Sequence, residues 1–107
     1  MTWQAGDVVF ANLDPVRGTE QRGSRPVIVI SVASLGPRVI VVPMTTTIRR
    51  WPTRIAVELH GIQSEAMCDQ VRTIDMDRLD EQLYGRISAR TTADIQRTVA
   101  RLIGVYI

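Results

Sequence analysis

Residues 17–30, "RGTEQRGSRPVIVI", place three arginines and a glutamate directly before a run of apolar side chains. An arginine guanidinium is a rigid, permanently charged set of donors that matches phosphate oxygens in pairs. Pro26 restricts Arg25 to an extended conformation, which holds Arg25 on a rigid part of the backbone. Gly18 and Gly23 favour a compact loop whose backbone N–H groups can bind an anion. The segment is a candidate phosphate-binding site. On these residues alone, the interpretation favoured here is a loop that only caps a sheet, with Arg25 paired to a surface carboxylate.

Two later segments carry further groups that could contact a nucleic acid. In "VVPMTTTIRR" a buried strand ends in three threonines, whose hydroxyls can donate to phosphate oxygens, and two arginines follow. In "CDQVRTID" the side chains of Asp69, Gln70 and Arg72 could contact base edges or the nucleic-acid backbone. Both segments also suit ordinary strands, because threonine is common in strands and the second segment alternates polar and apolar residues.

Trp51 and His60 have chemistry that could serve a nuclease, and both have simpler interpretations. Trp51 could stack on a base, but a Trp-Pro pair more often covers the edge of a core, which is the interpretation favoured here. His60 has the pKa for acid–base work in RNA cleavage. It lies beside Gly61 in a predicted surface turn, with no second histidine in the chain, and is assigned to that turn.

Composition limits the class of protein. A chain of 107 residues with 45% hydrophobic content predicts one folded domain rather than disorder. All thirteen basic residues are arginine, which suits phosphate binding and equally suits the codon usage of a GC-rich genome. The lone Cys68 can form neither an internal disulfide nor, with one histidine, a zinc site, which favours a reducing cytoplasm. No signal peptide and no run of ~20 apolar residues is expected to direct the chain to a membrane.

The elements that must position these groups are mostly strands. Val8 begins the first apolar run, and turn residues separate it from the later runs. Strands are expected at residues 8–13, 27–31, 39–44, 54–59 and 66–72. The second and third runs are continuously apolar, which is typical of strands buried on both faces.

The last third of the chain changes pattern. Met76, Leu79 and Leu83 have helical spacing, so a short helix is expected over residues 75–83, with Gly85 as its C-terminal glycine. "GRIS" suggests a last short strand. A closing helix is expected to begin at Thr91, with Asp94 in a capping arrangement. Its apolar stripe comprises Ile95, Val99, Leu102 and Ile103. The pattern predicts a small curled or barrel-like sheet with a helix across it.

Taken in order, "GDVVFANLDP", "RGTEQRGSRPVIVIS", "VIVVPMTTTIRRWPT", "CDQVRTIDMDRL" and "GRIS" cover nearly the whole chain. In this combination the sequence resembles the MazF/PemK family of toxin endoribonucleases. The resemblance implies one domain over residues 1–107, of the α+β (mainly β) class. Its expected architecture is a small SH3-like curled antiparallel barrel with a short helix and a C-terminal helix, assembled as a homodimer.

The resemblance also implies a function. The family cleaves single-stranded RNA, usually mRNA, at short sequence motifs without a metal, a cofactor or the ribosome. The products carry a cyclic phosphate and a 5′-hydroxyl. A cognate MazE-like antitoxin normally blocks the toxin by laying an acidic C-terminal segment across the RNA groove, since both partners supply negative charge.

Residue by residue, the resemblance places the catalytic roles on Arg25, Thr45 and Glu20. The expected RNA-binding residues, from the resemblance and the polar segments together, are Arg17, Gln21, Arg22, Ser24, Thr46, Thr47, Arg49, Asp69, Gln70 and Arg72. The sequence departs from the family pattern in its shorter link "SVASLGPR" and in Asn12, which replaces an aspartate common before L-D-P. Both departures lie beside the expected groove, where they bear on base recognition.

Two questions stay open at this point. In relatives the arginine is often given an acid–base role, but a guanidinium has too high a pKa to be an easy base, and Glu20 is chemically better suited. The other function classes are a CcdB-like toxin that acts on DNA gyrase and a non-catalytic RNA- or protein-binding SH3-like module. The apolar end "RLIGVYI" suits packing better than a gyrase contact.

Overall fold

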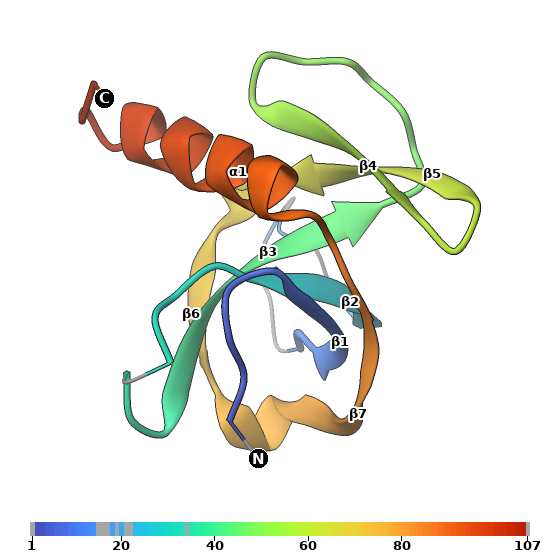
Figure 1. Cartoon of the computed structure of the whole chain (residues 1–107), viewed down its shortest axis with the longest axis vertical. Helices are drawn as coiled ribbons and strands as arrows, with labels where there is room; N and C mark the ends of the chain where they lie inside the picture. Colours follow the sequence, from blue (N-terminus) through green and yellow to red (C-terminus); the bar gives the residue numbers. More distant parts are fainter. Residues whose placement is uncertain (1, 15–17, 19, 21–22, 34, 107) are drawn as a thin grey trace.

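The protein is described from a computed structural model that covers residues 2–14, 18, 20, 23–33 and 35–106. Seven strands form one curled sheet in the order β4-β5-β3-β2-β1-β7, with β6 paired to β3 (Figure 1). Every pairing is antiparallel. The strands are β1 Asp7–Asn12, β2 Ser24–Val29, β3 Arg38–Thr45, β4 Arg54–Leu59, β5 Ile62–Met67, β6 Arg72–Asp75 and β7 Leu79–Arg86.

The central strands β1, β2 and β3 are buried on both faces, and for β2 and β3 this confirms the prediction from their continuous apolar runs. Val9, Val27 and Val41 belong to a cluster on one face of the sheet. Val8 and Ile28, their neighbours along the strands, belong to a second cluster on the other face. Because successive strand side chains point to opposite faces, a run of β-branched residues supplies both clusters at once.

The closing helix α1, Ala89–Leu102, is confirmed but begins earlier than the sequence predicts. Ser88 is the N-cap, and its Oγ accepts a hydrogen bond from the Thr91 backbone N–H at 3.1 Å. Ile95 anchors the helix in the second core cluster. The helix lies across the top of the sheet in Figure 1.

The predicted apolar stripe of α1 is only partly buried. Ile95 is fully buried and Val99 is half-buried, whereas Leu102 is 47% and Ile103 73% exposed. Tyr106 is 85% exposed. The apolar end that suits packing is therefore mostly exposed on this chain, over the described residues up to 106.

The short helix predicted over residues 75–83 is wrong. Only a single 3-10 turn forms there, Met76–Arg78, in which the Asp75 side chain accepts from the Asp77 backbone N–H at 2.9 Å. Leu79 then enters β7, which pairs with β1 along most of its length. The helical spacing of Met76 and Leu79 reflects this one turn, which directs both side chains to the first core cluster. Tertiary pairing with β1 overrides the local helical signal.

The strand predicted over residues 66–72 is also interrupted. β5 ends at Met67, a 3-10 turn covers Cys68–Gln70, and β6 begins at Arg72. Burial, followed by the charge of Asp69, raises the pKa of the Cys68 thiol to about 11, so the thiol is not a nucleophile at neutral pH. The turn moves the chain from the β5 side of β3 to its β6 side.

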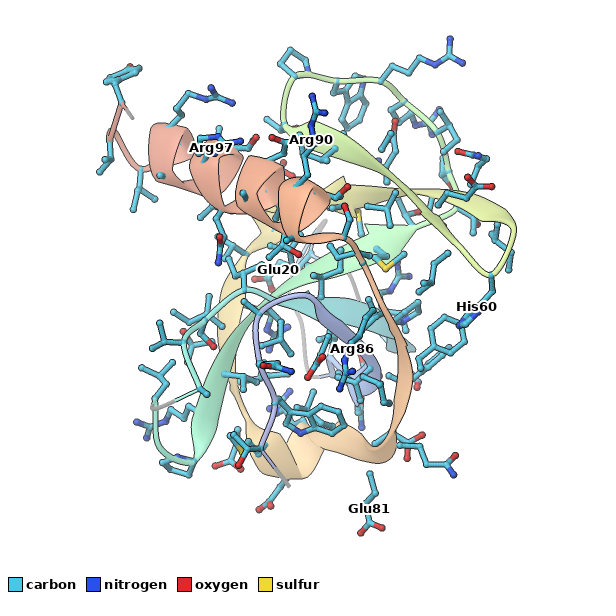
Figure 2. The ribbon with its side chains drawn as sticks, in the orientation of Figure 1. Glu20, His60, Glu81, Arg86, Arg90 and Arg97 are labelled. Atoms are coloured by element: carbon cyan, nitrogen blue, oxygen red, sulfur yellow. The ribbon has the colours of Figure 1, made fainter. Side chains whose placement is uncertain are left out.

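The sheet is curled but open. Among the described residues no strand pairing joins β6 to β7, and β4 and β7 are edge strands of the main path. His60, at the turn between β4 and β5, bridges these two edges, with its Nε2 2.6 Å from the Tyr84 carbonyl oxygen (Figure 2). Its φ of 54° confirms the predicted turn. No helix within the described ranges is both long and apolar enough to cross a membrane.

Candidate functional site

Three neighbouring hollows, which share lining residues, lie over β2, β3, β5 and the turn after β5. Their volumes are about 330, 520 and 240 Å³. The first and second hollows share Arg25, Thr45 and Thr47, and the second and third share Asp69 and Gln70. We call the three together the arginine groove. Most of the site residues predicted from the sequence that the structure describes lie along it.

Arg25 and Thr45 occupy the centre of the arginine groove. Arg25 enters β2 beside Pro26, as predicted, and its Nη1 donates to the Met44 carbonyl oxygen at 3.3 Å. Thr45 ends β3, and its Oγ1 accepts from the Thr47 backbone N–H at 3.1 Å. Because a hydroxyl both accepts and donates, Thr45 can still give its own proton to a ligand oxygen. A cation and a hydroxyl therefore line the same two hollows, which suits a phosphate group.

Glu20 lines the third hollow, whereas Arg25 lines the first and second. It is exposed and shares this hollow with Pro43 and Arg72. Arg72 is half-buried and donates from Nη1 to the Leu13 carbonyl oxygen at 3.1 Å, so it also supports the end of β1. Asp69 and Gln70 connect this hollow to the second one. The groove thus brings Glu20 to the same surface as Arg25, but at a neighbouring position.

Hydrogen bonds connect the two described ends of the segment between β1 and β2. The Gly23 backbone N–H donates to Asp14 Oδ1 at 3.0 Å, and Asn12 Oδ1 accepts from the Asp14 backbone N–H at 3.0 Å. One of the loop N–H groups that were expected to be available to an anion, that of Gly23, is therefore already bonded within the chain. Ser24 is exposed at the start of β2, opposite Asn12. Three predicted residues lie outside the described part of the chain: Arg17, Gln21 and Arg22.

Glu65 is a buried residue that supports the site and that the sequence analysis missed. It is 3% exposed, and its carboxylate accepts from the backbone N–H groups of Arg49 and Arg50 at 3.0 and 2.9 Å. Arg54 Nη1 donates to the same carboxylate at 3.0 Å. Burial works to raise the pKa of Glu65, but these hydrogen bonds and the charge of Arg54 hold it below its usual value. Glu65 therefore fixes the loop that follows β3.

Trp51 lies on that loop and does not cover the core edge, contrary to the interpretation favoured from the sequence. Trp51 is 51% exposed and lines the second hollow. The guanidinium carbons of Arg54 and Arg49 lie 4.8 and 6.0 Å from the ring centroid. Thr46, Thr47 and Arg49 are exposed on the same loop. The indole thus lines the groove and packs against the Arg54 guanidinium.

Residues 4–103 match the model of the PemK-like, MazF-like toxin of type II toxin–antitoxin systems. The chain belongs to this family, which confirms the resemblance. The endoribonuclease MazF of Staphylococcus saprophyticus is 38% identical to it over 110 residues, covering 94% of this chain and 91% of the relative.

Solved structures share the fold. The crystal structure of MazF from Deinococcus radiodurans has a TM-score of 0.88 at 24% identity, covering 98% of this chain and 99% of that one. An endoribonuclease in complex with its cognate antitoxin from a mycobacterial species has a TM-score of 0.80 at 22% identity, covering 98% of both chains. These similarities confirm the mainly β curled architecture with one C-terminal helix.

Proposed function

We propose that this family member is an endoribonuclease that cleaves single-stranded RNA in the arginine groove, and that it acts as a single domain in a homodimer. The observation that carries the proposal is that Arg25 and Thr45 line the same two hollows. Family membership and the MazF relative support the reaction class. We further propose that it acts in the cytoplasm, where mRNA is present.

The proposed reaction is attack by a ribose 2′-hydroxyl on the neighbouring phosphorus. The 2′-oxygen forms a bond to phosphorus as its proton leaves to a base, and the bond to the 5′-oxygen breaks as that oxygen takes up a proton. The products are a 2′,3′-cyclic phosphate and a 5′-hydroxyl. Arg25 stabilises the charge that develops on the phosphate oxygens, and Thr45 holds a non-bridging oxygen. A flexible single strand can align the 2′-hydroxyl with the leaving oxygen, which supports it over a duplex as the substrate.

The remaining predicted residues would bind the strand on either side of that phosphate. Arg49, Thr46 and Thr47 are exposed on the loop after β3 and suit backbone phosphates. Asp69 and Gln70 suit base edges. The acidic C-terminal segment of a MazE-like antitoxin would compete for the same cations; the mycobacterial structure that contains an antitoxin supports such a partner.

Glu20 is our candidate for the base that removes the 2′-proton. Changing Glu20 to Gln is expected to lower the cleavage rate by about 10²-fold and to remove the acidic limb of the pH–rate profile. Asp69→Asn is the matched control, because Asp69 is a second carboxylate on the groove and should leave that limb in place. An acidic limb that persists unchanged in Glu20→Gln would exclude Glu20 as the base.

The function is tested by incubating the purified protein with a long single-stranded RNA in EDTA, without ribosomes. We expect discrete fragments with 5′-hydroxyl and cyclic phosphate ends. An intact RNA whose band is shifted on a gel would instead indicate a binding module. Gyrase-linked DNA breaks in cells would indicate the CcdB-like alternative. Either of these two results, without cleavage, would contradict the proposal.

A further inference from the structure

Trp51 combines exposure with a position beside the phosphate-binding pair. About half of the surface of this residue is open to solvent, although its indole ring is large and hydrophobic. It lines the 520 Å³ hollow together with Arg25 and Thr45. An exposed aromatic ring in a cationic groove is a typical stacking surface for an unpaired base.

The ring has a fixed support. The Arg54 guanidinium lies 4.8 Å from the ring centroid, and the Arg54 side chain is only 9% exposed. Its Nη1 donates to Glu65 and, at 3.3 Å, to the Thr47 carbonyl oxygen. The Arg54 backbone N–H donates to the Trp51 carbonyl oxygen at 2.9 Å. Arg54 is therefore a buried cation that is fixed by two side-chain hydrogen bonds and supports the indole ring through a cation–π contact.

The backbone that carries Trp51 is also held in place. Arg50, the preceding residue, has a φ of 56°, a conformation that costs energy for a side chain other than glycine. The Glu65 carboxylate stabilises it by accepting the N–H groups of Arg49 and Arg50. A ring fixed before the ligand arrives loses little conformational entropy on binding, which is how a recognition surface gains affinity.

Two groups that can read a base edge line the same hollow. Asp69 offers acceptors, and Gln70 offers both a donor and an acceptor. Building on the proposed function, we propose that Trp51 is a specificity-determining platform on which one unpaired base stacks, next to the phosphate held by Arg25, while Asp69 and Gln70 contact its edge. Glu65 and Arg54 are positioning residues that act through Trp51.

The test begins by mapping the cleavage motif of the unaltered protein. An oligonucleotide spanning that motif, with a 2′-O-methyl group at the cleaved nucleotide, then binds without being cut. In a series of such oligonucleotides, each member lacks the base at one position of the motif. We expect removal of one base flanking the scissile phosphate to weaken binding to the unaltered protein about tenfold, and to have no further effect on Trp51→Ala. Trp51→Phe should restore the effect, and Trp51→Leu should not.

Tyr106→Ala is the matched control, because it truncates another exposed aromatic residue outside the groove and should behave as the unaltered protein. Fluorescence gives a second readout: in a Trp3→Phe background only Trp51 remains, and the bound oligonucleotide should quench it. If Trp51→Ala fails to fold, Trp51→Leu takes its place in the comparison.

The proposal would be overturned if removing a base lowered the binding affinity equally for Trp51→Ala and for the unaltered protein at every position. The proposal would also be overturned if Trp51→Ala bound RNA with unchanged affinity but bound an antitoxin peptide more weakly. That result would make the ring a protein contact. Failure of the proposed function is distinguishable, because an unaltered protein that never cuts RNA gives no motif to map.

Discussion

Changing Arg25 to alanine is expected to lower the RNA cleavage rate by at least about 10²–10³-fold and to leave the fold intact. The loss follows because, among the residues that the structure describes, Arg25 is the one cation that lines both the first and the second hollow. The fold is kept because Arg25 is only half-buried and its backbone pairs with β1 whatever its side chain. The measurement is the cleavage rate on a mapped RNA, with circular dichroism and thermal unfolding to verify folding.

Two variants give this result its meaning. Arg25→Lys keeps the charge but not the planar pair of donors, so its rate should fall between those of the alanine variant and the unaltered protein. Arg90→Ala removes an equal charge from the exposed side of α1, as Figure 2 shows, and should cleave normally. Near-normal cleavage by a folded Arg25→Ala protein would remove the site assignment.

Changing Glu65 to alanine is expected to give a large loss of stability, about 3–5 kcal/mol, together with weaker cleavage. The reason is that Arg54 would remain buried without its carboxylate, and the Arg49 and Arg50 N–H groups would lose their acceptor. Denaturant unfolding measures the change. Glu58→Ala, an exposed glutamate on the neighbouring strand β4, is the matched control and should change stability little.

The lowered pKa of Glu65 gives this prediction a pH dependence. Because the folded-state pKa lies below the ordinary value of 4.5, the ionised carboxylate stabilises the fold fully above that value. The stabilisation is lost as the pH falls through the folded-state pKa. The difference in unfolding free energy between the unaltered protein and Glu65→Gln should therefore shrink on going from neutral to strongly acidic pH. A difference that stays constant across this range would contradict the role given to Glu65.

The sequence predicted well those features that depend on neighbouring residues. The apolar runs located β1, β2 and β3 to within a few residues, and β4 was predicted at residues 54–59, where it lies. The prediction of a short helix over 75–83 failed because the pairing of β7 with β1 joins residues 68 to 79 positions apart in sequence. Local spacing cannot report a partner so distant, and here the partner determines the structure.

The same reasoning separates the predicted from the missed site residues. The residues Arg25 and Thr45 stand at the ends of recognisable buried strands, so their types and positions were informative. Glu65 is different, since its partners lie 11 to 16 positions away across a loop. One signal was present: Glu65 is a charged residue in the otherwise small or apolar run "SEAMC", which leads into a buried segment. An unexplained charge in such a run indicates a buried partner.

The central claim is that the scissile phosphate binds between Arg25 and Thr45. The most direct test is a crystal structure of the protein with an oligonucleotide spanning the mapped motif, blocked by a 2′-O-methyl group at the cleaved nucleotide. We expect the phosphate oxygens within hydrogen-bonding distance of the Arg25 guanidinium and the Thr45 hydroxyl. An oligonucleotide bound to another surface, with both side chains out of reach of its phosphates, would contradict the account.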